Sequence, residues 1–216
     1  MKLKKSKKMR KKKRLKERKA SIKRKTTEVD IEGEFNIDGT GITTIRTGSG
    51  PLDHLLTLFA FHGLFDLHLQ ARGDLRHHII EDIGIALGKA LKQALGDKSG
   101  INRYGSFSAT MDKVVVEANI DVGGRPTLKG MPTGIIDLLR DKRFDDTSFT
   151  CKETHEFLEA FVNSAGISLV YIVKSQEGDL HHILEALFKA LGKALDQATI
   201  IDPRRKGIPS TKGIID

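Results

Sequence analysis

Residues 73–91 read GDLRHHIIEDIGIALGKAL, and residues 178–195 read GDLHHILEALFKALGKAL. Both copies contain Gly-Asp-Leu, a His-His pair, a Glu three residues after the second His, and an apolar run with helical spacing. Residues three or four positions apart share one side of a helix, so each Glu lies within reach of either preceding histidine. The two histidines of a pair point about 100° apart, which suits two ions better than one. The duplication therefore predicts a metal site built from two related halves.

The residue types of the motif indicate which metals would fit. Imidazole nitrogen together with carboxylate oxygen suits Mn, Fe, Ni or Zn, and favours an octahedral ion over a thiolate-type zinc site. The motif supplies the candidate ligands His77, His78, Glu81, His181, His182 and Glu185. His54 precedes the first copy, and either His155 or Glu156 could play the same part before the second copy. We expect His62 and His68 to be structural.

The same order of strands and helices occurs around both copies. In the first half, residues 26–48 alternate as a hairpin, 51–62 form a buried helix, 65–71 a strand and 77–95 a helix. In the second half, two strands are expected within 106–128, a helix over 153–165, a strand over 167–174 and a helix over 181–198, with a loop over 129–150. This order predicts an α+β fold of two pseudo-repeated ββαβα halves, with helices packed on one face of a mainly antiparallel sheet.

The charge distribution divides the chain into a basic tail and a mildly acidic body. The net charge is +9, yet residues 1–25 contain 16 Lys or Arg and a single acid, Glu17. We expect four segments: a basic and disordered tail (1–25), a first half-repeat (26–105), a second half-repeat (106–200) and a C-terminal substrate loop (201–216). The tail is either a solubilising extension or an arm that binds nucleic acid through counterion release.

The remaining composition indicates where the protein works. No apolar run is long enough to span a bilayer, and no signal peptide is recognisable, so we expect no membrane contact. A single cysteine, Cys151, excludes an intrachain disulfide and fits a cytoplasmic location.

Cationic side chains outside the tail are suited to a phosphate. Arg103 follows the first motif helix, Arg125 ends a strand in GGRP, and Ser210 and Lys212 lie near the C-terminus. Guanidinium and ammonium groups with a hydroxyl are the partners that a phosphate monoester needs. The sequence contains no Walker A loop and no dinucleotide fingerprint, which favours a small phosphorylated substrate.

Taken together, these motifs resemble the imidazoleglycerol-phosphate dehydratase family of histidine biosynthesis. The resemblance runs over about residues 22–213 and includes DGTGI, TGSGPLDHLL, HHIIEDIGIALGKAL, GGRP, FVNSAGISL, HHILEALFKALGKAL and DPRRKGIPSTKG. It implies dehydration of imidazole glycerol phosphate to imidazole acetol phosphate and two manganese ions per site. It also implies a twenty-four-subunit homo-oligomeric cage with sites between subunits.

The resemblance implies a role for each matching residue. It implies metal ligation by His54, His77, His78, Glu81, His181, His182 and Glu185. One further ligand is either His155 or Glu156, of which Glu156 occupies the place where many members carry His. It implies catalytic carboxylates at Glu28, Glu81 and Glu185, of which Glu28 is the expected acid/base in a metal-assisted elimination. It implies substrate binding by Arg103, Arg125, Ser210, Thr211 and Lys212.

The chain departs from the family pattern beside the motif. Only Arg76 separates Gly-Asp-Leu from the first His-His pair, so this loop is shorter than in the family and is expected to lose an acidic partner of the histidines. Lys113 stands where the family usually has Glu. The alternatives are a weakly active relative whose basic tail binds nucleic acid, and a different metal-dependent phosphate-ester lyase.

Overall fold

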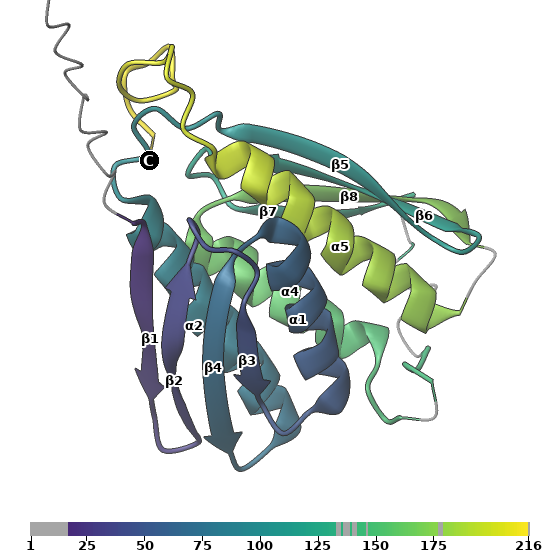
Figure 1. Ribbon diagram of the computed structural model, residues 1–216. Helices are drawn as coiled ribbons and strands as arrows, with labels where there is room; N and C mark the ends of the chain where they lie inside the picture. The colour runs from purple at the N-terminus through teal and green to yellow at the C-terminus, as the bar shows by residue number, and fades with distance from the viewer. Residues whose placement is uncertain are drawn as a thin grey trace, which may run out of the picture.

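Two four-stranded sheets enclose a layer of helices in this protein (Figure 1). The computed structural model describes residues 17–132, 135, 139, 142–145, 147–176 and 179–215. None of the helices in these residues is long and apolar enough to cross a membrane.

The first half of the chain forms one sheet and two helices. Its elements are β1 (Lys19–Lys25), β2 (Val29–Asn36), β3 (Thr43–Arg46), α1 (Gly50–Gly63), β4 (Asp66–Gly73) and α2 (Arg76–Leu95). The strand order is β1-β2-β4-β3. β1, β2 and β4 are antiparallel neighbours, whereas β3 runs parallel to β4.

The second half repeats this topology. Its elements are β5 (Tyr104–Met111), β6 (Val114–Asp121), β7 (Thr127–Met131), α4 (Cys151–Ala165), β8 (Ser168–Gln176) and α5 (Leu180–Thr199). The order β5-β6-β8-β7 matches the first sheet position by position, and β7 again runs parallel to β8. The predicted α+β fold with two repeated halves is confirmed.

The helices lie between the sheets and pair across the two halves. α2 packs against β1 and β2 on one side and against α4 on the other, while α5 packs against β5, β6 and α1. Each sheet therefore has one covered face and one outer face, as the alternation in β2 shows. Val29 and Ile31 are buried, and Asp30 and Glu32 between and beside them are exposed.

Glycines in the repeated motif bring the helices unusually close together. A methyl group built on Gly88 of α2 would lie 2.5 Å from the carbonyl oxygen of Phe161 in α4. One built on Gly192 of α5 would lie 2.3 Å from the carbonyl oxygen of Phe59 in α1. Gly88 and Gly192 occupy the same place in the two motif copies, eleven residues after the first histidine. The duplicated sequence therefore encodes the same backbone-to-backbone contact twice.

The structure corrects the prediction of a disordered tail through residue 25. Residues 19–25 form β1, whose Ala20 and Ile22 are buried in the core. Arg24 donates to Asp82 of α2 at 2.7 Å, which ties the strand to the helix. The strand was not recognised in the sequence because β1 contains only two apolar residues among its lysines and arginine. Residues 1–16 lie outside the described part of the chain.

The predicted hairpin over 26–48 is also wrong. β2 pairs with β1 and β4, and β3 joins the sheet as a parallel neighbour of β4. Parallel strands need a crossover, which α1 provides between β3 and β4. β7 stands in the same relation to β8 and begins before the predicted loop at 129–150, so each half contains one more strand than expected.

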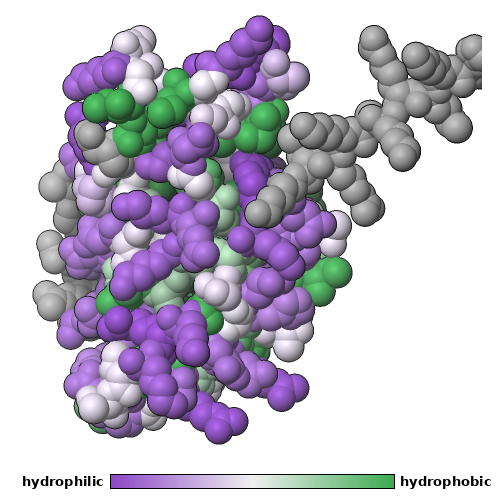
Figure 2. Space-filling model, turned by 90° about the vertical axis from the view of Figure 1, so that its left-hand side faces the viewer, coloured by the Kyte–Doolittle hydropathy of each residue, from purple (hydrophilic) through white to green (hydrophobic). Residues whose placement is uncertain are grey.

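β1 is an edge strand, and its charges keep that edge polar. Lys19 pairs with Glu34 at 3.2 Å, and Lys25 pairs with Asp30 at 2.6 Å. The molecular face on the β1 side of Figure 1 is largely hydrophilic, as Figure 2 shows. Charged side chains on an edge strand disfavour pairing with another chain.

We predict that Gly88→Ala destabilises the protein and that Gly50→Ala does not. The added methyl at residue 88 forces α2 away from α4, which should cost about 1–3 kcal/mol. A methyl at Gly50, the first residue of α1, would meet no atom within 4 Å. Urea or thermal unfolding of both variants measures the difference. Equal stability of the two variants would contradict the close helix contact.

Candidate metal centre

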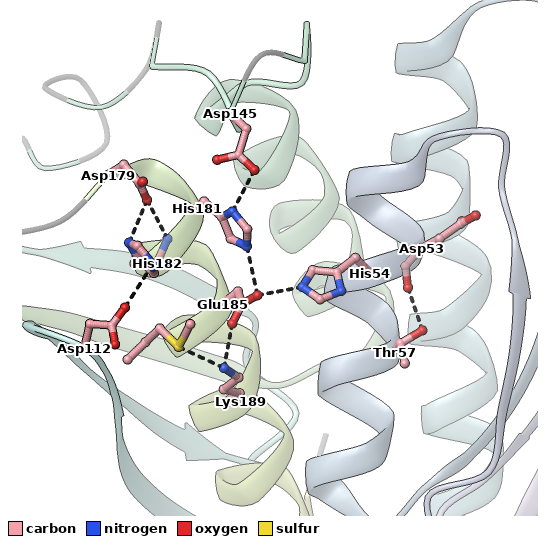
Figure 3. Close-up of polar contacts among 11 residues, drawn as sticks. Asp53, His54, Thr57, Asp112, Asp145, Asp179, His181, His182, Glu185 and Lys189 are labelled. Atoms are coloured by element: carbon pink, nitrogen blue, oxygen red, sulfur yellow. Dashed lines mark hydrogen bonds and ion pairs between the residues drawn. The ribbon is translucent and has the colours of Figure 1, made fainter.

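One group of three potential metal ligands converges between α1 and α5. His54 comes from α1, and His181 and Glu185 come from the N-terminal part of α5 (Figure 3). Their ligand atoms all lie within 4.8 Å of one another. Oε1 of Glu185 is 2.7 Å from Nε2 of His54 and 2.9 Å from Nε2 of His181. We call these three residues the His54 cluster.

Lys189 holds the other oxygen of Glu185 and was missed in the sequence. Its Nζ donates to Oε2 of Glu185 at 2.6 Å. Burial acts to raise the pKa of Glu185, but hydrogen bonds from Lys189, His54 and His181 outweigh it and hold the pKa at about 2. Glu185 is therefore ionised and directed at both imidazoles. Its i,i+4 spacing from Lys189 was the signal available in the sequence.

The cluster opens to the surface. The side chain of Glu185 is only 8% exposed, whereas that of His54 is 45% exposed. The carboxylate thus lies at the bottom of the cluster, and His54 forms the exposed side of the cluster in the described part of the chain.

The second nitrogen of His181 is held by a residue far away in the sequence. Nδ1 of His181 lies 2.8 Å from Oδ2 of Asp145, and the Phe144 ring stacks on the imidazole with centroids 4.4 Å apart. Burial acts to lower the pKa of His181, but its bonds to Glu185 and Asp145 together raise it. A hydrogen bond of this kind fixes the orientation of a ligand histidine.

His182 faces different partners from its neighbour, as the helical spacing predicts. Its Nε2 lies 3.2 Å from Asp112, and its Nδ1 lies 3.0 Å from Asp179. Asp179 also caps α5 by accepting from the backbone N–H of His182. The His181 and His182 side chains therefore face different carboxylates.

The first motif copy has a related but more exposed arrangement. Nδ1 of His78 lies 2.8 Å from Asp74 and 4.0 Å from the exposed Glu28 at the turn between β1 and β2. The hydrogen bond to Asp74 is the main cause of a raised pKa of His78. The His77 ring lies 4.3 Å from that of His78, and both His77 and Glu81 are exposed. Within the described residues, the His54 cluster is the one three-ligand group that converges.

The predicted loss of an acidic partner is wrong. Asp74 contacts His78, and Asp179 contacts His182. Each aspartate comes from a Gly-Asp-Leu sequence, so the motif itself provides the carboxylate expected from the missing loop residues. The shortened connection brings this aspartate to the start of the helix, beside the histidines.

The repeated glycine contact identifies the counterpart of His54 in the second half. Because Gly192 meets Phe59 and Gly88 meets Phe161, these two phenylalanines are equivalent. The residue five positions before Phe59 is His54, and five positions before Phe161 is Glu156. His155 instead lines a small apolar cavity with Cys151 and Tyr171, and its buried Nδ1 has no hydrogen-bond partner among the residues that the structure describes.

Of the residues expected to bind phosphate, Arg103 contacts the C-terminal segment that contains Ser210, Thr211 and Lys212. Arg103 donates to both carboxylate oxygens of Asp121, at 2.7 and 3.1 Å, and to the carbonyl of Pro209 at 3.0 Å. Next to Pro209, the hydroxyl of Ser210 accepts from the backbone N–H of Lys212. Arg125 is exposed, in the loop whose Gly123 lies against Arg103, and Thr211 is exposed. We call this group the Arg103 cluster.

The two clusters lie at opposite ends of α5. The backbone N–H of Arg103 donates to the carbonyl of Ala198, in the last turn, whereas His181 lies in the first turn. Seventeen residues at 1.5 Å per residue separate these ends by about 25 Å. A small phosphorylated molecule cannot contact both clusters of one chain.

The donor set of the His54 cluster fits a divalent transition metal. Two imidazole nitrogens and one ionised carboxylate oxygen converge, and His181 is oriented further by Asp145 and the Phe144 ring. Such mixed nitrogen and oxygen ligation suits Mn, Fe, Ni or Zn. An ion bound by these residues would need the two imidazole nitrogens and the carboxylate oxygen close together, and they lie within 4.8 Å of one another.

Comparison with known proteins identifies the chain's relatives. Residues 47–195 match the family model described as imidazoleglycerol-phosphate dehydratase. A protein of that name from Pelobacter propionicus is 49% identical over 198 residues, covering 90% of this chain and 97% of the relative. One from Thermoanaerobacter sp. is 48% identical with the same coverage.

Solved structures agree with the sequence comparison. The crystal structure of an IGPD from Pyrococcus furiosus superposes with a TM-score of 0.75 at 33% identity, covering 90% of this chain and all of that one. The imidazoleglycerol-phosphate dehydratase of Staphylococcus aureus superposes with a TM-score of 0.72 at 32% identity, covering 85% of this chain and all of that one. The chain, with its duplicated motif and its two equivalent halves, belongs to the imidazoleglycerol-phosphate dehydratase family.

Proposed function

We propose that this protein dehydrates imidazole glycerol phosphate to imidazole acetol phosphate in histidine biosynthesis, using two manganese ions per site. Family membership supports the reaction, and the convergence of His54, His181 and Glu185 supports a metal-dependent site. The observation that carries the proposal is this cluster, because it brings a histidine of the first half together with the His and Glu of the second motif copy.

The proposed ligands come from both motif copies and from the helices packed against them. They are His54, His77, His78, Glu81, Glu156, His181, His182 and Glu185. Glu156 is included instead of His155 because it is the equivalent of His54 and because His155 faces an apolar cavity. When bound, the ions act as Lewis acids and as a template for an imidazole ring.

The chain's own side chains then provide proton transfer and phosphate binding. Glu28 is exposed beside His78 and is suited to move the proton on the substrate carbon next to the carbinol. Glu81 and Glu185 are proposed to act as carboxylate ligands of the metal ions. Three of the five N–H donors of Arg103 bond to Asp121 and Pro209. The other two can donate to a phosphate. Arg125, Ser210, Thr211 and Lys212 complete the proposed phosphate contacts.

We propose that each complete site contains residues from more than one chain. The His54 and Arg103 clusters are about 25 Å apart along α5, too far for one substrate. The His54 cluster is open on its surface side, where a neighbouring chain can contribute. The family resemblance gives a twenty-four-subunit cage as the proposed assembly.

Loss of motif histidines should abolish both metal binding and turnover. We predict that His77→Ala and His181→Ala each lose bound Mn²⁺ and at least 10²-fold of the dehydration rate, since each removes a direct ligand. The measurements are metal content and product formation from imidazole glycerol phosphate after anaerobic reconstitution with Mn²⁺. His68→Gln is the matched control, because His68 is exposed on the outer face of β4. Full activity in either motif variant would refute the site.

Mixing of inactive variants tests whether sites are shared between chains. His181→Ala and Arg103→Ala damage opposite ends of α5, so random 1:1 assembly should restore roughly a quarter of the wild-type rate if two chains form each site. His181→Ala mixed with His54→Ala should stay inactive, since both residues belong to one cluster. A mass by light scattering measures the assembly. Recovery in neither mixture would contradict shared sites.

A second candidate function is nucleic-acid binding through the basic N-terminal segment. Residues 1–16 contain eleven Lys or Arg and no acid, and they lie outside the described residues. A groove of about 400 Å³ beside β1 and α2 favours this function. Its lining includes four cationic side chains, Lys23, Arg24, Lys25 and Lys89.

Titration with a single-stranded RNA over a range of salt concentrations tests this second function. The full chain should bind with an affinity that falls steeply as salt rises, because bound phosphates release counterions. The chain lacking residues 1–16 should bind at least tenfold more weakly. Equal binding by both proteins would exclude a role for the segment.

A further inference from the structure

Arg76 is the one residue between Gly-Asp-Leu and the first His-His pair. It is the first residue of α2 and directly precedes His77. Its Nε donates to Oε1 of Glu153 at 2.6 Å. One terminal nitrogen donates to the hydroxyl of Ser148, and the other donates to the carbonyl of Ser148 at 3.0 Å. Arg76 therefore uses both edges of its guanidinium on the start of α4 and the chain before it.

Glu153 is a nearly buried carboxylate that also closes the N-terminus of α4. Its Oε2 accepts from the backbone N–H of Thr150 at 2.8 Å, and the Thr150 hydroxyl accepts from the backbone N–H of Glu153. This capping box fixes the direction in which the chain enters the helix. With only 10% of its side chain exposed, Glu153 needs a charged partner, and Arg76 provides it.

The chain that enters α4 carries two of the groups that hold His181. Asp145 contacts Nδ1 of His181 at 2.8 Å, and the Phe144 ring stacks on the imidazole at an interplanar angle of 26°. The backbone folds back on itself here, since the N–H of Phe144 donates to the carbonyl of Phe149 at 2.8 Å. The bonds from Arg76 to Ser148 are therefore close to the contacts that Phe144 and Asp145 make with His181.

The backbone at Asp145 shows that this position is set by its surroundings. Asp145 has a φ of +49°, in the left-handed region that side chains other than glycine rarely adopt. Such a conformation persists only where neighbouring contacts hold it. The anchors of this segment within the described residues include the Ser148 and Glu153 bonds from Arg76, on one side, and the His181 contact on the other.

We propose that Arg76 is a positioning residue for His181: it anchors residues 142–145 and 147–150 so that Phe144 and Asp145 hold the imidazole toward Glu185 and His54. The route runs from the start of α2, through Ser148 and Glu153, to the first turn of α5. It links the first motif copy to the metal cluster of the second. This inference rests on the proposed metal site for its effect on binding, but the anchoring itself does not.

Metal titration of folded protein tests the effect on the cluster. Arg76→Gln should weaken Mn²⁺ binding at the His54 cluster about 10–100-fold, as loss of a group that orients a ligand histidine does. Arg76→Lys, which keeps the charge but has fewer directed donors, should restore part of the affinity. Arg72→Gln is the matched control, because Arg72 is an exposed arginine on β4, four residues earlier. Unchanged Mn²⁺ affinity in folded Arg76→Gln would overturn the proposal.

Asp145→Asn tests whether Arg76 acts through this segment. Asparagine tolerates the left-handed backbone and keeps an acceptor, but it removes the charge beside His181. If both residues act by one route, the double variant should bind Mn²⁺ about as weakly as the weaker single variant. Fully multiplicative losses would mean separate routes and would overturn the proposal.

Amide hydrogen exchange separates this inference from the proposed function, because it needs no metal. In metal-free protein, Arg76→Gln should increase exchange over residues 142–150, whereas Arg72→Gln should leave it unchanged. If the wild-type chain neither binds Mn²⁺ nor dehydrates the substrate, increased exchange still supports the anchoring while the proposed function fails. If exchange increases only within α4, after residue 150, Arg76 only supports the N-terminus of α4. That result would overturn the proposed anchoring.

Discussion

The close contact between helix backbones in the central layer determines most of this structure. Gly88 lies against the Phe161 carbonyl, and Gly192 lies against the Phe59 carbonyl. These contacts leave no room for a side chain, so each motif helix has a fixed register against one helix of the other half. α1 packs on α5, and α2 packs on α4. The halves are thereby joined through their helices, while the two sheets stay separate.

This pairing explains why the proposed metal ligands come from distant parts of the sequence. His54 belongs to the first half, yet its partners His181 and Glu185 belong to the second. The register set by Gly192 brings them together, and the same register in the other half places Glu156 in the position of His54. The two equivalent positions therefore differ in chemistry, an imidazole in one half and a carboxylate in the other, although the backbones are related by the repeat.

The sequence predicted the fold best where burial is periodic. The helices over 51–62 and 181–198 are close to α1 and α5, because their apolar stripes extend over many turns. β1 and β3 were missed or misassigned, since a short strand at a sheet edge carries few buried residues and its partner is chosen by tertiary packing. For the site, the local spacing predicted that His181 and His182 face different partners. It could not predict Asp145, because that contact depends on a distant segment. Lys189 was missed although its i,i+4 spacing from Glu185 was available.

Because residues 19–25 form strand β1, the point at which the chain is shortened matters. Removal of residues 1–16 leaves both sheets whole, whereas removal of residues 1–25 would delete β1. The second cut would expose the pairing edge of β2, beside the buried Val29, Ile31 and Phe35, and would leave Asp82 without Arg24. An unprotected edge next to apolar surface is a template for aggregation. The seven residues that look like part of a solubilising tail are thus the part that keeps the first sheet from joining another molecule.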